Sequence, residues 1–120
     1  MPFLPTPDYT PALPFRLGHI QTIYPTLFRR APEGAPIGER LETDDGDFLD
    51  IDWHFHRQHC RSERLVVISH GLEGNSRKKY MLGMAARLNE AGWDVICLNF
   101  RGCSGEMNRL PRLYHSGVTD

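Results

Sequence analysis

The sequence has no apolar run long enough to cross a bilayer, so we expect no membrane-spanning segment. Its three cysteines, Cys60, Cys97 and Cys103, lack a Cys-x-x-Cys spacing, which favours neither a disulfide framework nor a thiolate metal site. Neither charge dominates: 14 Lys and Arg residues stand against 15 Asp and Glu residues. This balance gives no electrostatic footprint for nucleic acid or an anionic membrane. The beginning of the chain lacks the basic and apolar regions of a signal peptide, so we expect a cytoplasmic location.

Prolines are concentrated at the beginning of the chain, where residues 1–37 hold eight of the nine. Proline restricts its own backbone and biases the preceding residue towards extended conformations. The same segment is rich in apolar side chains, which favour burial. We therefore predict an arm over residues 1–37 that docks on the rest of the protein. One short helix is expected in it, between Pro14 and Pro25 over residues 18–24.

A β-hairpin is predicted over residues 38–56, with its turn at residues 44–47, where Gly46 follows two aspartates. The alternation after the turn predicts a strand with one buried and one wet face. The side chains expected to be buried are Leu49, Ile51, Trp53 and Phe55. Those expected to face water are Asp50, Asp52, His54 and His56.

The predicted wet face raises the question of a metal site, because His54, His56 and His59 are close in sequence to Asp50 and Asp52. Histidines at i and i+2 of a strand could share a metal ion, but the polar half of an amphipathic strand has the same pattern. Spacing without a complete ligand set is weak evidence. We predict no metal and no cofactor.

Residues 65–100 have the pattern of a βαβ unit. Residues 65–68 are a continuous aliphatic run, predicted to be a parallel strand buried on both faces. Residues 77–91 are predicted to form a helix, and residues 95–98 a second buried strand. The buried helix face is expected to hold Tyr80, Met84 and Leu88, flanked by Met81 and Ala85. The helix is expected to have Asn75 or Ser76 as its N-cap and to stop at Gly92.

Two loops, residues 69–76 and 99–106, follow the two predicted strands and should reach the same edge of the sheet, where open α/β sheets bind ligands. The first loop lacks both the Gly-x-Gly-x-x-Gly pattern of dinucleotide-binding folds and the Gly-Lys-Ser/Thr of a P-loop. Its His70-Gly71-Leu72 segment instead fits the loop that supplies half of the oxyanion hole in α/β-hydrolases. The Leu72 N–H is the expected donor.

Three segments carry a specific resemblance: residues 70–74, residues 99–106 with Asn108, and residues 114–117. In order and spacing they resemble the YheT-type branch of the α/β-hydrolases, which is similar to the abhydrolase-domain lipid esterases. The proline-rich arm resembles the arm of that family too.

The resemblance implies an α/β fold, with residues 38–120 forming the first, incomplete part of an α/β-hydrolase domain. This part would hold a β-hairpin followed by a βαβ crossover in a mostly parallel sheet. The activity implied is that of a serine carboxylic-ester hydrolase acting on a small-molecule ester, either a short acyl ester or an acylglycerol-type lipid.

The resemblance also implies how the site residues divide. This chain would supply half of the oxyanion hole, from Leu72 and Gly71. His70, Glu73, Gly74 and Arg101 would order the loops at the site rim. No Gly-x-Ser-x-Gly elbow is present, so the Ser/Asp/His triad is expected downstream. We therefore expect the chain alone to be inactive.

Several residues are of types that occur in hydrolase active sites, but their sequence context favours other roles. Ser104 lies in a Gly-x-Ser-Gly segment whose second glycine comes one residue early, so we interpret it as a loop residue that bonds to backbone. His115 and Ser116 are adjacent and should point in opposite directions. Arg101 could bind a substrate anion, but a brace through carbonyls or through Glu106 is favoured.

A non-catalytic interaction module that binds a partner along an unpaired sheet edge is the alternative to the enzyme. Sequence downstream with Gly-x-Ser-x-Gly would favour the enzyme. The oligomeric state is not predicted.

Overall fold

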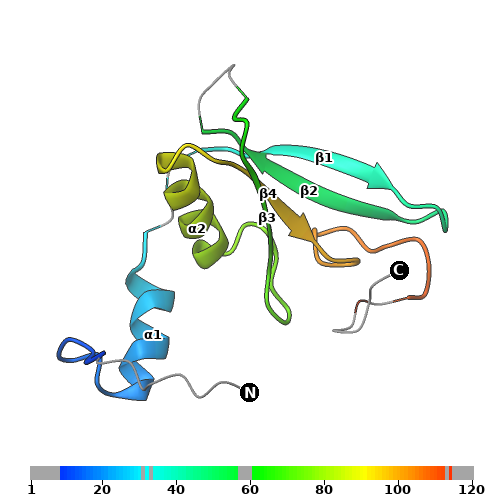
Figure 1. Cartoon of the computed structure of the whole chain (residues 1–120). Coiled ribbons are helices and arrows are strands. Elements are labelled where there is room, and N and C mark those ends of the chain that lie inside the picture. The colour runs from blue at the N-terminus through cyan, green and yellow to red at the C-terminus, as the bar shows by residue number, and fades with distance from the viewer. Residues whose placement is uncertain (1–8, 31, 33, 57–60, 113, 115–120) are drawn as a thin grey trace, which may run out of the picture. The chain divides into compact units, whose positions relative to one another are not determined.

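The computed structural model describes residues 9–30, 32, 34–56, 61–112 and 114. The order of elements is α1, β1, β2, β3, α2 and β4 (Figure 1). The chain divides into two compact units, residues 1–30 and 31–120. The docking of the predicted arm, residues 1–37, stays a prediction.

Helix α1, Gly18–Phe28, is the helix expected in the arm, but it is longer than predicted. The prediction ended it before Pro25, whereas Pro25 lies inside it. Proline removes one backbone hydrogen bond, yet its φ is compatible with a helix. The helix also continues past Pro25 because the Arg29 N–H donates to the Pro25 carbonyl at 3.2 Å.

Four strands form one mixed sheet in the order β1-β2-β4-β3. Strands β1 (Ile37–Glu42) and β2 (Phe48–His54) pair antiparallel, as the predicted hairpin requires. Strand β4 (Asp94–Asn99) pairs antiparallel with β2 and parallel with β3 (Leu65–Ser69). The parallel pair and the helix between its strands form the predicted βαβ unit. The fold is therefore α/β, with the hairpin and crossover expected of the start of an α/β-hydrolase domain.

The hairpin turn lies where the sequence predicts it. Gly46 has a φ of +82°, a conformation that L side chains rarely adopt. The Gly46 N–H donates to the Thr43 carbonyl, and the Thr43 N–H donates to the Asp47 carbonyl at 3.0 Å. These bonds set the register in which Glu42 lies opposite Phe48.

Helix α2, Lys79–Glu90, packs on one face of the sheet (Figure 1), and only part of the predicted side faces the sheet. Met81 and Ala85 are buried against Val95 and Cys97, with Leu88 at the margin. The expectation that Tyr80 and Met84 lie in this core is wrong, because their exposed fractions are 46% and 55%. The apolar side chains of α2 span more than one face, and the side holding the small Ala85 allows the closest approach to the sheet.

The ends of α2 are partly as predicted. Its N-cap is Lys78, which makes no side-chain capping bond, so the prediction of Asn75 or Ser76 is wrong. The Asn75 side chain accepts from the Arg77 N–H, and the Ser76 side chain donates to Asp52, so both are engaged elsewhere. The stop at Gly92 is confirmed: its φ is +84°, and its N–H donates to the Asn89 carbonyl.

The predicted wet face of β2 is the face that α2 covers. Asp52 lies opposite Cys97 of the core and is only 6% exposed, and His54 lies opposite Val95. The expectation of water contact is therefore wrong for Asp52. The side chains predicted to be buried, such as Ile51, share the other face of β2. Ile51 lies opposite Leu98, so this face points away from α2.

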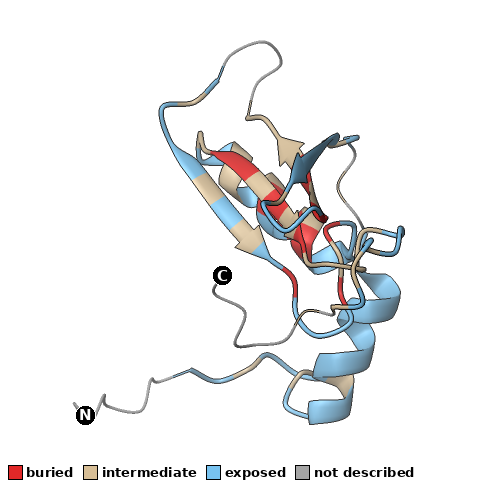
Figure 2. Cartoon of the chain, turned by 90° about the vertical axis from the view of Figure 1, so that its right-hand side faces the viewer, coloured by how far each residue is buried: buried red, intermediate tan, exposed pale blue. Residues whose placement is uncertain are grey.

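The prediction that residues 65–68 form a strand buried on both faces is wrong. In β3, Leu65 is 49% exposed and Val67 is 60% exposed. Strand β3 lies at the end of the described sheet order, and α2 covers only the side that carries Ile68. Strand β4 is largely buried, as predicted. Figure 2 shows buried residues gathered in β2, β4 and α2, whereas β3 has none.

Within the described ranges, no helix is both long and apolar enough to cross a membrane.

Candidate functional site

The two predicted loops, residues 69–76 and 99–106, meet at the carboxyl ends of β3 and β4. The Phe100 N–H donates to the His70 ring at 3.2 Å, and the Ser76 N–H donates to the Asn99 side chain at 2.8 Å. The His70 and Phe100 rings pack edge to face, with centroids 4.9 Å apart. The two loops therefore form one connected site.

His70 lies between the two loops, and its hydrogen bonds indicate which ring nitrogen donates and which accepts. Because the Phe100 N–H can only donate, Nε2 of His70 accepts, and the ring proton lies on Nδ1. Nδ1 is 2.8 Å from the Gly71 carbonyl oxygen and donates to it. Both ring nitrogens are engaged and the residue is 5% exposed, so His70 orders the loop and has no nitrogen available as a general base.

The peptide that joins Gly71 and Leu72 is held by its carbonyl. The Gly71 oxygen accepts from His70 Nδ1 and from the Gly74 N–H at 2.9 Å. In a trans peptide the C=O and the following N–H point in opposite directions. The Leu72 N–H is therefore directed away from these two donors.

The amides on either side of Leu72 are engaged. The Gly71 N–H donates to the Tyr80 hydroxyl at 2.9 Å, and the Glu73 N–H donates to the Tyr114 hydroxyl at 2.9 Å. Among the residues that the structure describes, the Leu72 N–H donates to no acceptor. The loop thus presents, at the position predicted for the oxyanion hole, a backbone donor that has no acceptor among the described residues.

Gly74 and Glu73 give this loop its shape. A Cβ on Gly74 would lie 2.8 Å from the Tyr80 hydroxyl and 2.9 Å from the Gly71 oxygen, so no side chain fits there. At Gly71 the nearest such contact would be 3.9 Å, which is an ordinary separation. Glu73 has a φ of +53°, a left-handed conformation that costs a non-glycine residue about 1 kcal/mol. The tight turn after Leu72 therefore depends on Gly74 and on backbone strain at Glu73.

Arg101 braces the second loop against the hairpin turn. Its guanidinium contacts Asp47 at 2.7 Å and Asp45 at 2.9 Å, and its side chain is 10% exposed. The sequence favoured Arg101 as a brace between loops, and its contacts in the structure are of that kind. Glu106, the acidic partner suggested for it, instead pairs with Arg40 at 2.7 Å. The correct partners were missed because they lie more than 50 residues away in the sequence. Both ends of the guanidinium are occupied, which leaves little capacity for a substrate anion.

Asp47 is the centre of this brace and has no exposed surface. Its carboxylate accepts from the N–H groups of Phe48 and Arg109 and from the side chains of Arg101 and Asn108. Burial alone would raise the pKa of Asp47, but these hydrogen bonds outweigh it and lower the pKa to about 2. The charge is therefore retained although the group is buried.

Ser104 lies beside Arg40 and Asp50 and has none of the surroundings of a nucleophile. Arg40 and the Ser104 hydroxyl both hydrogen bond to the Asp50 carboxylate, and together they lower the pKa of Asp50. Its partner is thus a side chain rather than the predicted backbone group. His115 and Ser116 lie outside the described residues, as does His59 of the metal question. No group of three or more metal-binding side chains occurs in the described part of the chain.

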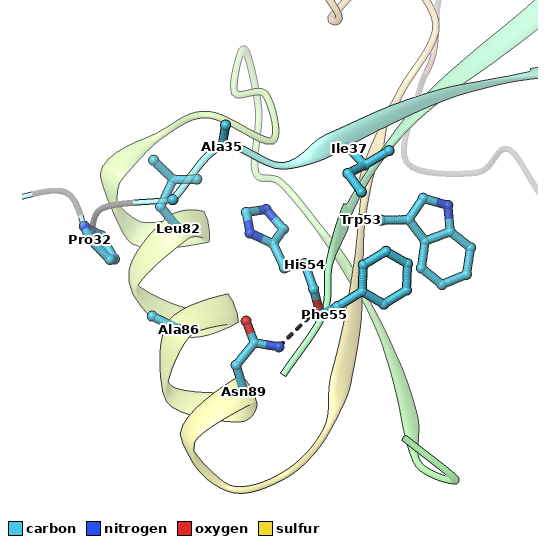
Figure 3. A pocket seen from close by; sticks show the side chains of 10 residues that line it. Pro32, Ala35, Ile37, Trp53, His54, Phe55, Leu82, Ala86 and Asn89 are labelled. Atoms are coloured by element: carbon cyan, nitrogen blue, oxygen red, sulfur yellow. Dashed lines mark hydrogen bonds between the residues drawn. The ribbon is translucent and has the colours of Figure 1, made fainter. Parts of the chain in front are cut away.

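A separate pocket of about 580 Å³ lies between α2, the end of β2 and the segment before β1 (Figure 3). His54 is directed into it, and its Nε2 is buried without a partner among the described residues. Burial lowers the pKa of His54. Asn89 donates to the His54 carbonyl at 2.9 Å. The pocket includes no residue of the two loops, so it does not form part of the candidate site.

No family model matches the chain. The chain is 39% identical, over 98% of its length, to a protein of Escherichia coli named "Putative esterase YheT". The chain belongs to the YheT-type α/β-hydrolases. Other relatives of this YheT-type chain include "Phospholipase ABHD3" of Bos taurus, which is 31% identical over 79% of the chain. A third, "Embryogenesis-associated protein EMB8" of Picea glauca, is 26% identical over 84% of the chain.

The YheT-type chain spans only part of these relatives: 35% of the E. coli protein, 25% of the bovine protein and 24% of the Picea protein. Among solved structures, a lidless serine α/β-hydrolase of Xanthomonas campestris is 21% identical, with a TM-score of 0.48. That match covers 65% of this chain and 37% of the other.

The sequence did not point to the two tyrosines that hold the loop. Tyr80 was assigned to the helix core, and the Tyr114 contact with Glu73 spans 41 residues. The only sequence signal for Tyr114 was its place in the third segment of the family resemblance.

Proposed function

We propose that this chain supplies half of the oxyanion hole of a serine carboxylic-ester hydrolase that acts on short-chain esters or acylglycerol-type lipids. The observation that carries the proposal is the peptide between Gly71 and Leu72. Its carbonyl has two donors, while its N–H has no acceptor among the described residues. The names of the relatives, an esterase and a phospholipase, support the class of reaction.

The chemistry requires a donor that is in place before the reaction begins. A serine hydroxyl attacks the ester carbonyl, its proton passes to a histidine, and negative charge develops on the carbonyl oxygen. The Leu72 N–H would donate to that oxygen, together with the N–H that follows the nucleophile. A preorganised donor of this kind contributes on the order of 3 kcal/mol to transition-state stabilisation.

The groups around Leu72 would act by keeping it in place. His70 and Gly74 hold the Gly71 carbonyl, and Arg101 holds the second loop against the hairpin. Gly71 contributes the carbonyl side of the peptide, so its own N–H, which donates to Tyr80, is not the donor. This favours Leu72, within the predicted pair, as the proposed donor.

The chain alone should not hydrolyse esters, because among the described residues no serine hydroxyl is hydrogen-bonded to a histidine that could act as its base. The purified chain is incubated with p-nitrophenyl butyrate, and release of p-nitrophenol is compared with a buffer blank. We expect no serine-dependent turnover. Burst kinetics that a serine-directed phosphonate abolishes would contradict this expectation.

A chimera tests the ester-hydrolase function itself. Residues 1–120 replace the matching third of the E. coli relative, whose remaining part completes the protein. Hydrolysis of p-nitrophenyl butyrate by the chimera, at a rate above that of either part alone, would support the proposal. A chimera that folds cooperatively and hydrolyses neither short esters nor acylglycerols would contradict it.

The exposed edge strand favours a second candidate, the non-catalytic interaction module. Leu65 and Val67 are exposed on β3, which pairs only with β4 among the described strands. An edge of this kind can accept a strand from another chain. A folded but inactive chimera, together with β3 amides that become protected from exchange when a partner is added, would favour this candidate.

A further inference from the structure

We propose that Tyr80 and Tyr114 are a pair of positioning residues that orient the Leu72 N–H. Their hydroxyls accept the N–H groups of Gly71 and Glu73, the amides on either side of Leu72. The assignment rests on the proposed function for its catalytic meaning, but the orientation of the amide can be measured without catalysis.

Hydrogen bonds hold the loop backbone on both sides of Leu72. A short loop with three successive free amides could rotate its peptides, because each N–H could find water in several orientations. Here the first and third amides each have a tyrosine oxygen at 2.9 Å. With both neighbours held, and with the Gly71 carbonyl held by His70, the peptide of Leu72 has one orientation.

Tyr80 is anchored in helix α2. Tyr80 belongs to the first turn of α2, so it ties the loop to the helix that packs on the sheet core. The missing side chain of Gly74 leaves room for its hydroxyl, since a Cβ there would lie 2.8 Å from that oxygen. Tyr80 is nearly half exposed, so its burial does not explain its place, whereas the hydrogen bond does.

Tyr114 ties the loop to the other side of the site. Its ring stacks on Phe100 with centroids 5.1 Å apart and an interplanar angle of 9°. It also packs edge to face against His70, with centroids 6.0 Å apart. A hydrogen bond with Tyr114 lowers the pKa of Cys103, although burial of the thiol outweighs it. Tyr114 thus connects both loops, and a shift of the second loop would be transmitted to Glu73.

The strain at Glu73 fits this arrangement. A left-handed non-glycine residue persists where surrounding contacts hold it in place. The bond from the Glu73 N–H to Tyr114 is such a contact, and it belongs to the strained residue itself. Loss of the hydroxyl should therefore let this residue relax and the preceding peptide rotate.

The test uses the full 120-residue chain, labelled with ¹⁵N, and the variants Tyr80→Phe and Tyr114→Phe. Each variant keeps the ring and removes the acceptor. Amide hydrogen exchange is measured together with residual dipolar couplings, which report the direction of each N–H. Tyr24→Phe is the matched control, because Tyr24 belongs to α1 in the other compact unit, residues 1–30.

We expect Tyr114→Phe to speed exchange at Glu73, and Tyr80→Phe to speed it at Gly71, by roughly fivefold in each case. The coupling of the Leu72 N–H should change in both variants and stay as in the parent in Tyr24→Phe. Couplings of β4 and the melting temperature should not move, which separates positioning from a general structural role.

Unchanged exchange at Glu73 and Gly71, or an unchanged Leu72 coupling, would overturn the proposal. The chimera adds a catalytic readout, in which we expect kcat to fall about tenfold in Tyr114→Phe while KM stays constant. An unchanged kcat in an active chimera would also overturn it. An inactive parent chimera would count against the proposed function alone, because the exchange and coupling data would still decide how the amide is held.

Discussion

One face of the four-stranded sheet packs against α2, and the other carries apolar side chains that the described residues only partly cover. On the α2 face, Val95 and Cys97 have no exposed surface, and the polar Asp52 and Asn99 are buried with hydrogen-bond partners. On the other face, Val67 is 60% exposed although it is aliphatic. In this sheet, burial depends on what covers a residue more than on the polarity of its side chain.

This difference reflects how an α/β sheet is assembled. Such sheets are covered on both faces, by helices that different crossovers supply. The described residues contain one crossover helix, and it covers one face. Two buried polar residues of that face are tolerated because they have partners: Asp52 accepts from the Ser76 hydroxyl, and Asn99 accepts from the Ser76 N–H.

The largest predicted effect tests which side of α2 meets the sheet. Ala85→Asp places a carboxylate where no surface is exposed, and should cost at least about 4 kcal/mol of unfolding free energy. Met84→Asp, at the neighbouring exposed position, should cost less than about 1 kcal/mol. Urea unfolding followed by tryptophan fluorescence measures both. Equal losses would mean that the helix is rotated from the orientation described.

The second effect concerns the buried charge of Asp47. Asp47→Asn leaves its donors without a charged acceptor and should lower the melting temperature by on the order of 10 °C. Asp44→Asn, in the exposed part of the same turn, is the matched control and should change it little. A melting temperature that falls equally in both variants would argue against Asp47 as the centre of the brace.

The same residue predicts a pH dependence with a defined sign. The pKa of Asp47 is about 2 when folded and near 3.8 when unfolded, so the unfolded chain takes up the proton first as the pH falls. Its contribution to stability is therefore complete above about pH 4 and is lost as the pH falls towards about 2. Asp47→Asn should lack this part of the acid dependence. Identical acid-unfolding curves for the parent and the variant would contradict the assignment.

The smallest predicted effect is a difference between the two faces, measured by making the same valine-to-alanine substitution on each. Val95→Ala removes two methyl groups from the face that α2 covers and should lower the free energy of unfolding by about 2 kcal/mol. Val67→Ala removes the same atoms from the opposite face, here called the open face, and should lower the free energy of unfolding by less than about 0.5 kcal/mol. Both residues lie in the parallel pair, one in β4 and one in β3. Equal costs would show that the open face is covered in solution.

Much of the fold could be predicted because local signals agree with the final structure. The turn at Gly46, the stop at Gly92 and the two strands of the crossover all follow from residues adjacent in sequence. The phase of α2 could not be predicted, because apolar residues such as Tyr80 and Met84 continue around the helix. Which strand face is covered depends on where α2 packs, and alternation along β2 does not contain that information.

The candidate site was predictable at the level of its loop and not of its supports. His70, Gly71 and Leu72 lie in one short motif after a strand, so their proximity follows from the sequence. The contacts that hold them come from Tyr80, Phe100 and Tyr114, on other elements. Such long-range contacts leave no periodic signal in a single sequence. The same applies to Arg101, whose acidic partners lie in the hairpin turn.

The most direct test of the account asks whether the Leu72 N–H is the donor. In the chimera with the E. coli relative, Leu72→Pro removes this N–H, whereas Leu72→Ala keeps it and changes only a side chain that is almost fully exposed. We predict that Leu72→Ala retains the kcat of the parent chimera within about twofold, and that Leu72→Pro loses on the order of 100-fold. Both variants should melt at the temperature of the parent. Equal kcat values for the two variants would contradict the assignment of Leu72 as an oxyanion donor.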